Sequence, residues 1–512
     1  FLPIINLLMF PVIWIATIRS YGFNKRLDSF LVIATLGFYI YYVNYALDVT
    51  YVENRDLHPK TALGEWVSSI VFAVVAATLV HTYFIQPYVI PTGSLERTLR
   101  VGDLLFVSKF HYGARTPMTA IAAPMVHDTL PVIGAPSYLN KPQIPYFRLP
   151  GFKDIKRKEI VVFSWPADTV RQFFVAEKGV RKPIDKKSNY VKRCVGIPGD
   201  SIEVRDGYVF ANGKQLELPD RAKPQFDYIA YSNKGVSSKM LLQSGVAAFR
   251  RKYSVQSLSR EQQIALANEG YYASQEGQNI VIGADMNGIP PEIVRQNRLA
   301  LQEITERARL VTLTQGMKEK LEKNAAIDSL VRLITPKGQG NTKLFPQNKN
   351  YPWNYSNMGP IYIPKKGKTV KLDTKVLPFY KKIIREYEEN TLSVLGNEIS
   401  INGQVVDSYT FKQDYYWMMG DNRDHSEDSR AWGYVPENHI VGTPIFIWMS
   451  FDNFTDIKGR VNKIWKWKPR WDRIFTTVNG TGEPVSYFKW FLIALAGYFA
   501  FDYFWKRKKS KQ

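Results

Sequence analysis

The sequence Ile90-Pro91-Thr92-Gly93-Ser94-Leu95-Glu96 directly follows a long apolar segment, which extends from about Trp66 to Ile85. Pro91 and Gly93 interrupt regular structure, so this stretch predicts a sharp turn after a helix. The turn would hold the hydroxyl of Ser94 just outside the apolar segment. A serine in such a place most often caps or stabilises the turn itself. A chemical function for Ser94 therefore needs support from other parts of the chain.

The composition limits the classes of function. The 512 residues carry a formal net charge of +22, but the positive residues are scattered and no zinc-finger, phosphate-loop or dinucleotide motif is found, so we expect no nucleic-acid partner. A basic chain also suits contact with anionic lipid. The single cysteine, Cys194, excludes an intramolecular disulfide and a multi-cysteine metal site. The six histidines have no metal-ligand spacing, so we expect neither a metal nor another cofactor.

Apolar segments at both ends of the chain predict contact with a bilayer. They are Phe1–Ile18, Ser29–Leu47, Trp66–Ile85 and Tyr487–Trp505. The third is the best candidate for a membrane-spanning helix, because a bilayer requires about 20 apolar residues. The fourth ends in the basic tail Lys506–Lys511, which favours a cytoplasmic C-terminus and places the region between the third and fourth segments on the opposite side. Basic residues between the first two segments conflict with the positive-inside tendency, so the topology of these two is left open.

The region after the third apolar segment has the pattern of antiparallel strands. Short apolar or alternating runs bounded by turn residues are Leu104–Ser108, Glu159–Ser164, Tyr190–Val195, Ser201–Val204, Tyr208–Phe210, Glu398–Ile401, Trp417–Met419 and Pro444–Met449. Asn212-Gly213 and Asn402-Gly403 are typical of tight hairpin turns. The predicted fold is therefore mainly β, with a mixed α/β insertion and transmembrane helices at both ends.

The insertion is predicted where the pattern changes, between about Pro219 and Leu395. Pro290–Thr335 has helical periodicity and few breakers, and Phe379–Asn390 has the pattern of a further short helix. Three tryptophans then alternate with cations before the last apolar segment, which suits the lipid interface. Stacking on nucleic acid is the alternative for these tryptophans.

These patterns divide the chain into eight parts. The β core occupies 89–218 and 395–452, and the insertion or cap occupies 219–394 between them. The other parts are an N-terminal membrane region at 1–64, a transmembrane helix at 65–88, a juxtamembrane segment rich in Trp and Lys at 453–486, a C-terminal transmembrane helix at 487–505 and a basic cytoplasmic tail at 506–512.

Lys192 is the candidate base for Ser94. Serine is a poor nucleophile until a base accepts its proton, and no histidine is an obvious partner. A lysine can be that base when burial disfavours its charged form and lowers its pKa. Alternation in the strand places Tyr190, Lys192 and Cys194 on one side, with Val191, Arg193 and Val195 on the other. A lysine that protects a strand edge from aggregation is the alternative.

A third stretch, Gly420–Gly433, combines acids, arginines and serines in one loop. Such groups form dense networks of charge-assisted hydrogen bonds. Most of this loop is interpreted as structural.

Together the three stretches resemble bacterial type I signal peptidases, the membrane-bound serine proteases that remove signal peptides. The matching motifs are P-T-G-S at 91–94 with a following T-L and G-D, then Y-V-K-R-C-V-G-I-P-G-D at 190–200, then G-D-N-R-D-x-S-x-D-S-R-x-W-G at 420–433. They occur in the family's order behind an apolar segment. The resemblance covers Tyr88 to about Leu218 and Leu395 to about Met449, and it implies an antiparallel β catalytic domain of signal peptidase type.

The resemblance implies a role for each matched residue. Ser94 would be the nucleophile and Lys192 the general base, with the Ser94 N–H and the Thr92 hydroxyl as the oxyanion hole. Ser426 would orient the lysine amine. The loop would be braced by Asp421, Asp428 and Arg430. Shallow pockets for small side chains would be lined by Tyr88, Ile90, Leu95, Leu99 and Val191, and substrate would bind as an added strand.

The chain departs from the family pattern at three of these motif positions. Leu95 stands where Met is usual, and the similar volume of the two side chains should preserve the pocket. Arg97 replaces a common Pro and His425 a common Asn, and neither touches the implied chemistry. The presence of both Ser94 and Lys192 disfavours an inactive homologue.

The implied function is removal of N-terminal signal peptides from exported pre-proteins through an acyl-enzyme on Ser94. The implied location is the bacterial inner membrane, as a multi-pass protein with its catalytic domain on the periplasmic side. The implied partners are signal peptides of pre-proteins, the bilayer and the secretion translocon.

Three other classes of protein share some of these features. A penicillin-binding protein requires Ser-x-x-Lys, but Arg97 occupies the lysine position. Self-cleaving repressor-type proteases also use a serine–lysine dyad, but they are soluble. The four apolar segments of this chain argue against that class. A non-catalytic membrane-anchored scaffold or assembly factor built on the same core is the alternative from another class.

Overall fold

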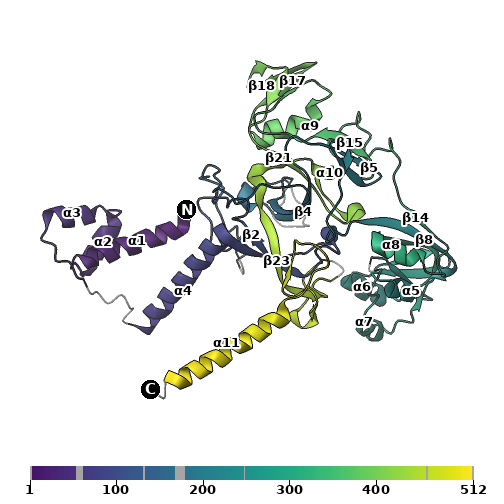
Figure 1. Ribbon diagram of the computed structural model, residues 1–512, viewed down its shortest axis with the longest axis horizontal. Coiled ribbons are helices and arrows are strands. Elements are labelled where there is room, and N and C mark those ends of the chain that lie inside the picture. Colours follow the sequence, from purple (N-terminus) through teal and green to yellow (C-terminus); the bar gives the residue numbers. More distant parts are fainter. Residues whose placement is uncertain are drawn as a thin grey trace.

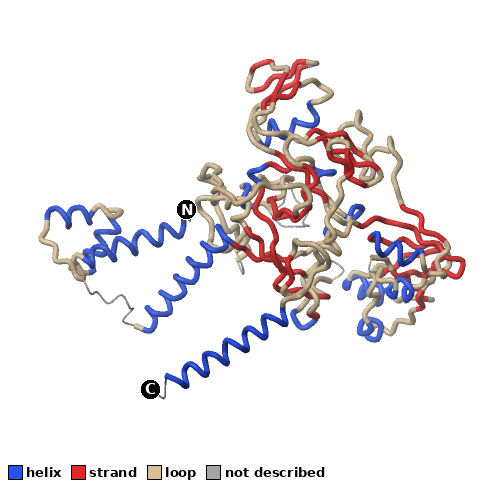
Figure 2. Tube along the Cα trace, in the orientation of Figure 1, coloured by secondary structure: helices blue, strands red, loops and turns tan. Residues whose placement is uncertain are grey.

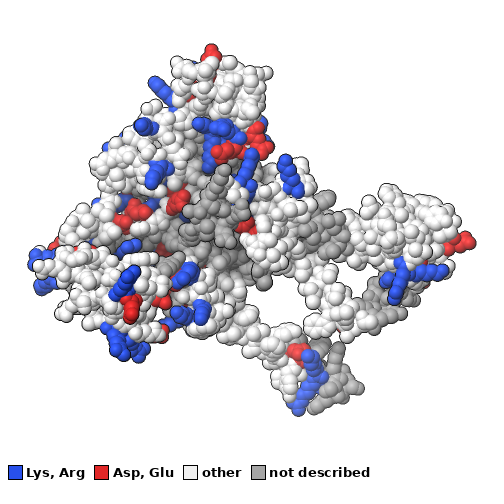
Figure 3. Space-filling view, turned by 180° about the vertical axis from the view of Figure 1, so that it is seen from behind, with Lys and Arg blue, Asp and Glu red and all other residues white. Residues whose placement is uncertain are grey.

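The structure is a computed structural model that describes residues 3–53, 61–130, 133–167, 179–246, 248–456 and 459–509. Strands form the body of the molecule, and long helices extend from it toward both chain ends (Figure 1; Figure 2). Lys and Arg side chains are spread over the body rather than gathered in one stripe on the face that Figure 3 shows.

A nine-stranded sheet forms the centre of the body, and all its pairings are antiparallel. Its main path has the order β1–β2–β23–β3–β4–β21–β22, and β24 and β25 pair with β23. The strands are β1 (Ile85–Val89), β2 (Asp103–Ser108), β3 (Ile160–Ser164), β4 (Asn189–Gly196), β21 (Tyr415–Met419), β22 (Val435–Pro436), β23 (Ile440–Asp452), β24 (Lys468–Pro469) and β25 (Thr476–Thr477). Segments from both sides of the insertion thus build one sheet, and the predicted antiparallel β class is confirmed.

A second sheet packs beside the first. It has the order β15 (Met358–Tyr362), β5 (Ser201–Arg205), β6 (Tyr208–Ala211) and β7 (Lys214–Gln215). The turn before β7 has positive φ at Asn212 (52°) and Gly213 (80°), as the predicted hairpin turn requires. Ile202 and Trp417, from the two sheets, are buried in one hydrophobic cluster. Burial of such large apolar groups is the main force that holds the two sheets together.

The predicted helix across Pro290–Thr335 is wrong for most of its length. Only α7 (Pro291–Gln296) and α8 (Gln315–Glu322) are helical there, whereas β12 (Gln302–Glu303), β13 (Glu306–Thr314) and β14 (Ser329–Arg332) are strands. β13 and β14 flank β8 (Gln225–Val236) in one sheet. Val311 and Leu313 are buried in that sheet's core, so packing against a distant strand overrides local propensity. The helix predicted at Phe379–Asn390 is confirmed as α9 (Leu377–Lys382) and the π-helical turn Ile383–Tyr387.

The rest of the insertion forms small sheets and short helices. A further four-stranded sheet has the order β10 (Ala273–Glu276), β11 (Asn279–Ala284), β9 (Arg251–Val255) and β12. The short helices of this region are α5 (Ser238–Gln243) and α6 (Arg260–Glu269). β16 (Thr369–Lys371) pairs with β20 (Ser408–Thr410), and β17 (Leu392–Leu395) with β18 (Glu398–Ile401), which also pairs with β19 (Gln404–Val405). β15 and β16 lie within 219–394 but pair with strands outside it, and β17 crosses the predicted limit at 394. The predicted domain limits remain a prediction.

One long apolar helix leads into the central sheet. α4 (Ala62–Leu79) continues through the helical turn Val80–Phe84, and the 23 residues Ala62–Phe84 are long and apolar enough to cross a membrane. Within the described residues no other single helix meets this test, and α2 (Arg26–Ala34) and α3 (Tyr39–Ala46), which are bent by 120° relative to each other, would qualify only as one broken span.

The other predicted apolar segments also form helices. α1 (Pro3–Ser20) covers the first segment, and α11 (Phe488–Lys509) covers the predicted C-terminal helix. Lys489 and Asp502 reduce the apolar character of α11. α4 and α11 nevertheless leave the body on the same side (Figure 1).

Candidate active site

Ser94 lies at the surface of the 3₁₀ turn Gly93–Leu95, which follows β1. Ser94 is half-buried and Thr92 is exposed. Thr92 is extended, with φ −131° and ψ 151°. Leu95 is buried and anchors the turn in the hydrophobic core. The turn therefore presents two hydroxyl-bearing residues outward and holds its apolar residue inside.

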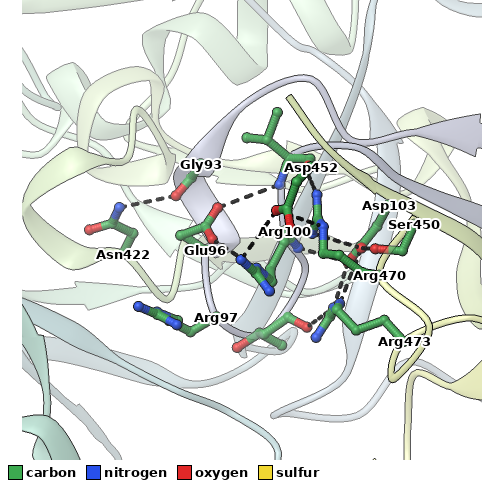
Figure 4. A network of polar contacts seen from close by, with 12 residues as sticks. Gly93, Glu96, Arg97, Arg100, Asp103, Asn422, Ser450, Asp452, Arg470 and Arg473 are labelled. Carbon is green, nitrogen blue, oxygen red and sulfur yellow. Dashed lines mark hydrogen bonds and ion pairs between the residues drawn. The ribbon is translucent and has the colours of Figure 1, made fainter. Parts of the chain in front are cut away.

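Asn422 fastens this turn to the acidic loop. Its backbone N–H donates to the Ser94 carbonyl oxygen and its Nδ2 donates to the Gly93 carbonyl oxygen, each at 3.0 Å; Figure 4 shows the second bond. The Thr98 hydroxyl also donates to Asp421 Oδ2 at 2.7 Å. Both bonds of Asn422 go to main-chain oxygens, so they fix the backbone that carries the Ser94 side chain. The sequence offered no signal for this role beyond the place of Asn422 in the motif.

Lys192 is buried in β4, with 2% of its surface exposed. β4 runs between β3 and β21, so Lys192 is not on a sheet edge. Its ammonium lies 5.6 Å from the centre of the Tyr190 ring, and within the described residues it makes no ion pair. Burial lowers the pKa of Lys192 to about 8, although the Asp428 carboxylate opposes this shift. Because the turn of Ser94 contacts β4, a lysine that loses its proton readily lies next to the serine segment.

Gly420 packs closely against both Ser94 and Ser426. A Cβ on Gly420 would lie 2.5 Å from the Ser94 carbonyl oxygen and 2.6 Å from Ser426 Cβ. Only glycine therefore allows this approach. Ser426 is 5% exposed, and its Oγ makes no hydrogen bond to any described residue. A buried hydroxyl without a partner is unusual in folded proteins. The role that the resemblance implies for Ser426, orientation of the Lys192 amine, stays a prediction.

Two buried ion pairs brace the loop. Arg430 donates to Asp428 through Nε and Nη2, both at 2.8 Å, and neither side chain has exposed surface. Asp428 also caps α10 (Ser429–Trp432) and accepts the Gly420 N–H at 3.1 Å. Arg193, next to Lys192, donates to both oxygens of Asp421 at 2.8 and 2.6 Å. Asp428 thus pairs with Arg430 and Asp421 with Arg193, and the bracing role that the resemblance implies for the loop residues stays a prediction.

We expect Arg430→Met to lower the free energy of unfolding by about 3–5 kcal/mol, because it leaves the Asp428 charge buried without a partner. Urea unfolding of the purified chain, followed by tryptophan fluorescence, measures this change. The matched control is Arg460→Met, whose ion pair with Asp456 is formed by a guanidinium side chain that is 63% exposed; it should cost less than about 1 kcal/mol. Equal effects of the two substitutions would contradict the bracing role.

The five predicted pocket residues lie in one hydrophobic cluster. Ile90, Leu95 and Leu99 are buried, whereas Tyr88 and Val191 are only partly buried and remain accessible. Tyr88 is in β1, which is an edge strand of the central sheet. An edge strand offers unpaired backbone groups to an extended peptide. The cluster therefore combines an apolar surface with a strand edge.

A second set of contacts, in addition to those of Asn422, holds the segment that follows Ser94, and the sequence did not predict it. Asp103 is fully buried and binds Arg470 at 3.4 Å, while Arg473 Nη2 donates to Asp103 Oδ2 at 2.5 Å and to the Thr98 carbonyl oxygen at 3.2 Å (Figure 4). Arg470 also donates to the carbonyl oxygen of Val101. The sequence suggested contact with lipid, or stacking on nucleic acid, for this basic segment. Its arginines also hold the stretch that follows Ser94, through Thr98, Val101 and Asp103.

The insertion contributes a third set of contacts to the Ser94 segment, through the first residues of β8. Gln225 is 1% exposed; its N–H donates to the Asp421 carbonyl oxygen at 2.9 Å and its Nε2 to the Glu96 carbonyl oxygen at 2.5 Å. Asp227 accepts a hydrogen bond from Thr312 Oγ1 at 2.6 Å and lies 3.0 Å from His425 Nε2. Gln225 thus bridges the Ser94 segment, through its side chain, and the acidic loop, through its backbone N–H.

We expect Gln225→Ala to reduce kcat by about 10- to 100-fold with a smaller change in KM, because small displacements of reacting groups cost rate rather than binding. Steady-state kinetics on a peptide substrate, with the thermal unfolding midpoint measured in parallel, provides the test. Gln404→Ala in β19, at an exposed site, is the matched control and should leave kcat unchanged. An unchanged kcat in a folded Gln225→Ala protein would show that the insertion does not position the site.

Comparison with known proteins identifies the family. A family model described as signal peptidase, peptidase S26, matches residues 63–272 and 362–449, and residues 1–54 match a family of unknown function. Signal peptidase I of Buchnera aphidicola is 23% identical over 83% of this chain and 93% of its own length, and that of Haemophilus influenzae is 23% identical over 83% and 79%.

Signal peptidase I of Rickettsia massiliae is 28% identical over 31% of this chain. This match covers 46% of the relative's own length, so the chain spans about half of that protein. The family match covers more than half of the chain and both segments of the central sheet that carry Ser94, Lys192 and the acidic loop. The resemblance seen in the sequence is thereby confirmed: the chain belongs to the signal peptidase family, peptidase S26.

Proposed function

We propose that this chain is a membrane-bound serine endopeptidase that removes N-terminal signal peptides from exported pre-proteins. The observation that carries the proposal is the burial of Lys192, a lysine without an ion-pair partner among the described residues, in the strand that contacts the Ser94 turn. A buried lysine that no ion pair stabilises lowers the stability of the protein, so its retention favours a chemical role.

In the proposed mechanism, neutral Lys192 accepts the proton of Ser94 Oγ as this oxygen attacks the scissile carbonyl carbon. The Ser94 N–H and the Thr92 hydroxyl stabilise the oxyanion. When the tetrahedral intermediate collapses, the peptide C–N bond breaks, the leaving amine takes the proton from Lys192, and the signal peptide stays esterified to Ser94. Water, deprotonated by Lys192, then attacks the ester and regenerates both groups. Ser426 would hold the amine toward Ser94, and no metal or cofactor takes part.

The substrate is proposed to bind as an extended strand along the free edge of β1. Tyr88 and Val191 would contact the substrate above the buried apolar residues Ile90, Leu95 and Leu99, and this shallow surface would favour small side chains at the cleavage site. The helix Ala62–Phe84 holds this edge next to the bilayer in which the apolar part of a signal peptide would lie.

The proposed setting is the bacterial inner membrane. α4 and α11 leave the body on the same side, which supports a second membrane segment at α11 and a multi-pass protein (Figure 1). The basic residues after Trp505 favour a cytoplasmic C-terminus and thus a periplasmic catalytic body. The secretion translocon would deliver the pre-proteins.

We expect kcat/KM to fall about tenfold per pH unit below pH 8, because only the neutral amine of Lys192, whose pKa burial lowers to about 8, accepts the serine proton. Above that pH the rate should level off. The measurement is a pH–rate profile on a peptide that spans a signal-peptide cleavage site, with circular dichroism at each pH as the control for folding. A profile that stays flat to pH 5 would exclude Lys192 as the base.

A further inference from the structure

A polar cavity lies at the end of the membrane helix, outside the proposed catalytic residues. It has two adjoining lobes of about 150 and about 190 Å³. Both lobes are lined by Thr82, Gln86, Lys109, Pro117, His127 and Asp185. Thr78 and His81, in the last turns of the helix Ala62–Phe84, line the larger lobe, and Tyr88 and Asn189 line the smaller. The cavity therefore connects the membrane boundary with the beginning of the proposed substrate edge.

Cations outnumber acids in this cavity. Lys109, Arg115 and Lys186 line it, and Asp185 is the one acid among its described lining residues. Asp185 is already satisfied, since it accepts the N–H groups of Met118 at 3.0 Å and Thr119 at 2.9 Å and the Thr119 hydroxyl at 2.6 Å. Asp185 also attracts the charges of Arg115 and Lys186, so one acid serves the three cations of the cavity.

Arg115 and Lys186 also have partners within the protein. Arg115 donates to the Asn438 carbonyl oxygen at 2.9 Å and to Ser164 Oγ at 3.3 Å. Lys186 Nζ lies 3.5 Å from the Val126 carbonyl oxygen and 5.3 Å from the centre of the Tyr138 ring. Neither cation is left without a contact.

Lys109 differs from these neighbours. Its backbone N–H donates to the Phe84 carbonyl oxygen at 2.9 Å, which fixes it against the end of the membrane helix. Its amine makes no hydrogen bond or ion pair with any residue in the described part of the chain. Burial and the nearby Arg115 charge lower the pKa of Lys109 to about 7. An anion in the cavity would supply the missing partner and restore the charged form.

We propose that this cavity binds the phosphate group of an anionic membrane phospholipid, with the Lys109 amine as its main contact. A phosphate accepts charge-assisted hydrogen bonds from ammonium and guanidinium groups, and each lobe holds several water-sized groups, which is enough for a phosphate. The last turns of Ala62–Phe84 line the cavity, so with this helix in the bilayer the site would lie at the depth of lipid headgroups. A bound headgroup there would hold the beginning of β1 at a fixed height above the bilayer.

Native mass spectrometry of the detergent-purified full chain, titrated with dihexanoyl phosphatidylglycerol, tests the proposal. The unmodified chain should show one saturable adduct. Lys109→Gln should weaken it at least about tenfold, the effect of one lost charge-assisted hydrogen bond. Lys109→Arg should retain it, and Lys214→Gln, at an exposed site in β7, is the matched control that should leave it unchanged. Unchanged affinity in Lys109→Gln would overturn the site.

Other probes separate the sources of phosphate. Dihexanoyl phosphatidylcholine, whose headgroup has no net charge, should bind more weakly than phosphatidylglycerol. Inorganic phosphate that bound as tightly as phosphatidylglycerol, and in a Lys109-dependent manner, would overturn the assignment to lipid. Should Lys109→Gln not fold, Thr116→Glu places a carboxylate in the cavity wall and should abolish the adduct. Because binding is measured in the Ser94→Ala background as well, its outcome is independent of the proposed peptidase activity.

Discussion

Ser94→Ala is expected to reduce kcat by at least about 10⁴-fold, because removal of an attacking serine leaves only the contributions of substrate binding and the oxyanion hole. The substitution should not disturb the turn. Asn422 holds it through the main-chain oxygens of Gly93 and Ser94, and these bonds do not involve the hydroxyl. KM and the thermal unfolding midpoint should therefore stay close to those of the unmodified chain. Single-turnover cleavage of a peptide with an excess of enzyme measures the loss.

The matched control for Ser94→Ala is Ser201→Ala, an exposed serine at the beginning of β5. It should retain full activity. Residual activity within tenfold of the unmodified chain in a folded Ser94→Ala protein would mean that another group attacks the substrate.

Lys192→Met should produce a similar loss of activity, about 10³- to 10⁴-fold, but with a distinctive effect on stability. Methionine fills nearly the same volume and lacks the amine. Because the amine is buried without an ion-pair partner among the described residues, its removal should leave the free energy of unfolding unchanged or raise it. Lys192→Arg should be inactive as well, since a guanidinium does not release its proton at neutral pH. Kinetics and urea unfolding of the same preparations test both parts.

Lys182 provides the contrast. It is also buried, with 5% of its surface exposed, but its amine lies 3.3 Å from Asp128 Oδ2. Lys182→Met should therefore reduce stability and leave kcat unchanged. Should Lys192→Met destabilise the chain in the same way while keeping its activity, Lys192 would be a structural residue.

The sequence predicted the central fold well where the signal is local. β3 and β21 are short, fully buried runs, β4 is buried from Lys192 onward, and the Asn212-Gly213 turn specifies its own hairpin. The helix predicted across Pro290–Thr335 failed because β13 is stabilised by its pairing with β8, some 80 residues earlier in the chain. Such long-range pairing leaves no mark in local periodicity. The same holds for β15, which lies within the predicted insertion and pairs with β5 of the predicted core.

The residues of the candidate site also fall into two groups, those that a local motif marks in the sequence and those that only long-range contacts reveal. Ser94, Lys192 and Ser426 stand in motifs, so their residue types and order pointed to one chemistry before their positions in space were known. Gln225, Arg470 and Arg473 were not identified, because their partners lie far away in the sequence. A glutamine or arginine in a polar stretch looks solvated until the fold shows which backbone oxygens it reaches. Burial of these polar groups was therefore visible only in three dimensions.

The most direct measurement compares cleavage of a purified secretory pre-protein by the unmodified chain, Ser94→Ala and Lys192→Ala in detergent, with product masses determined by mass spectrometry. We predict that the unmodified chain shortens the pre-protein by its signal peptide, at a bond that follows a small residue, and that both variants leave it intact. A folded chain that cleaves none of several pre-proteins would favour the non-catalytic scaffold. Full activity in either variant would contradict the serine–lysine mechanism.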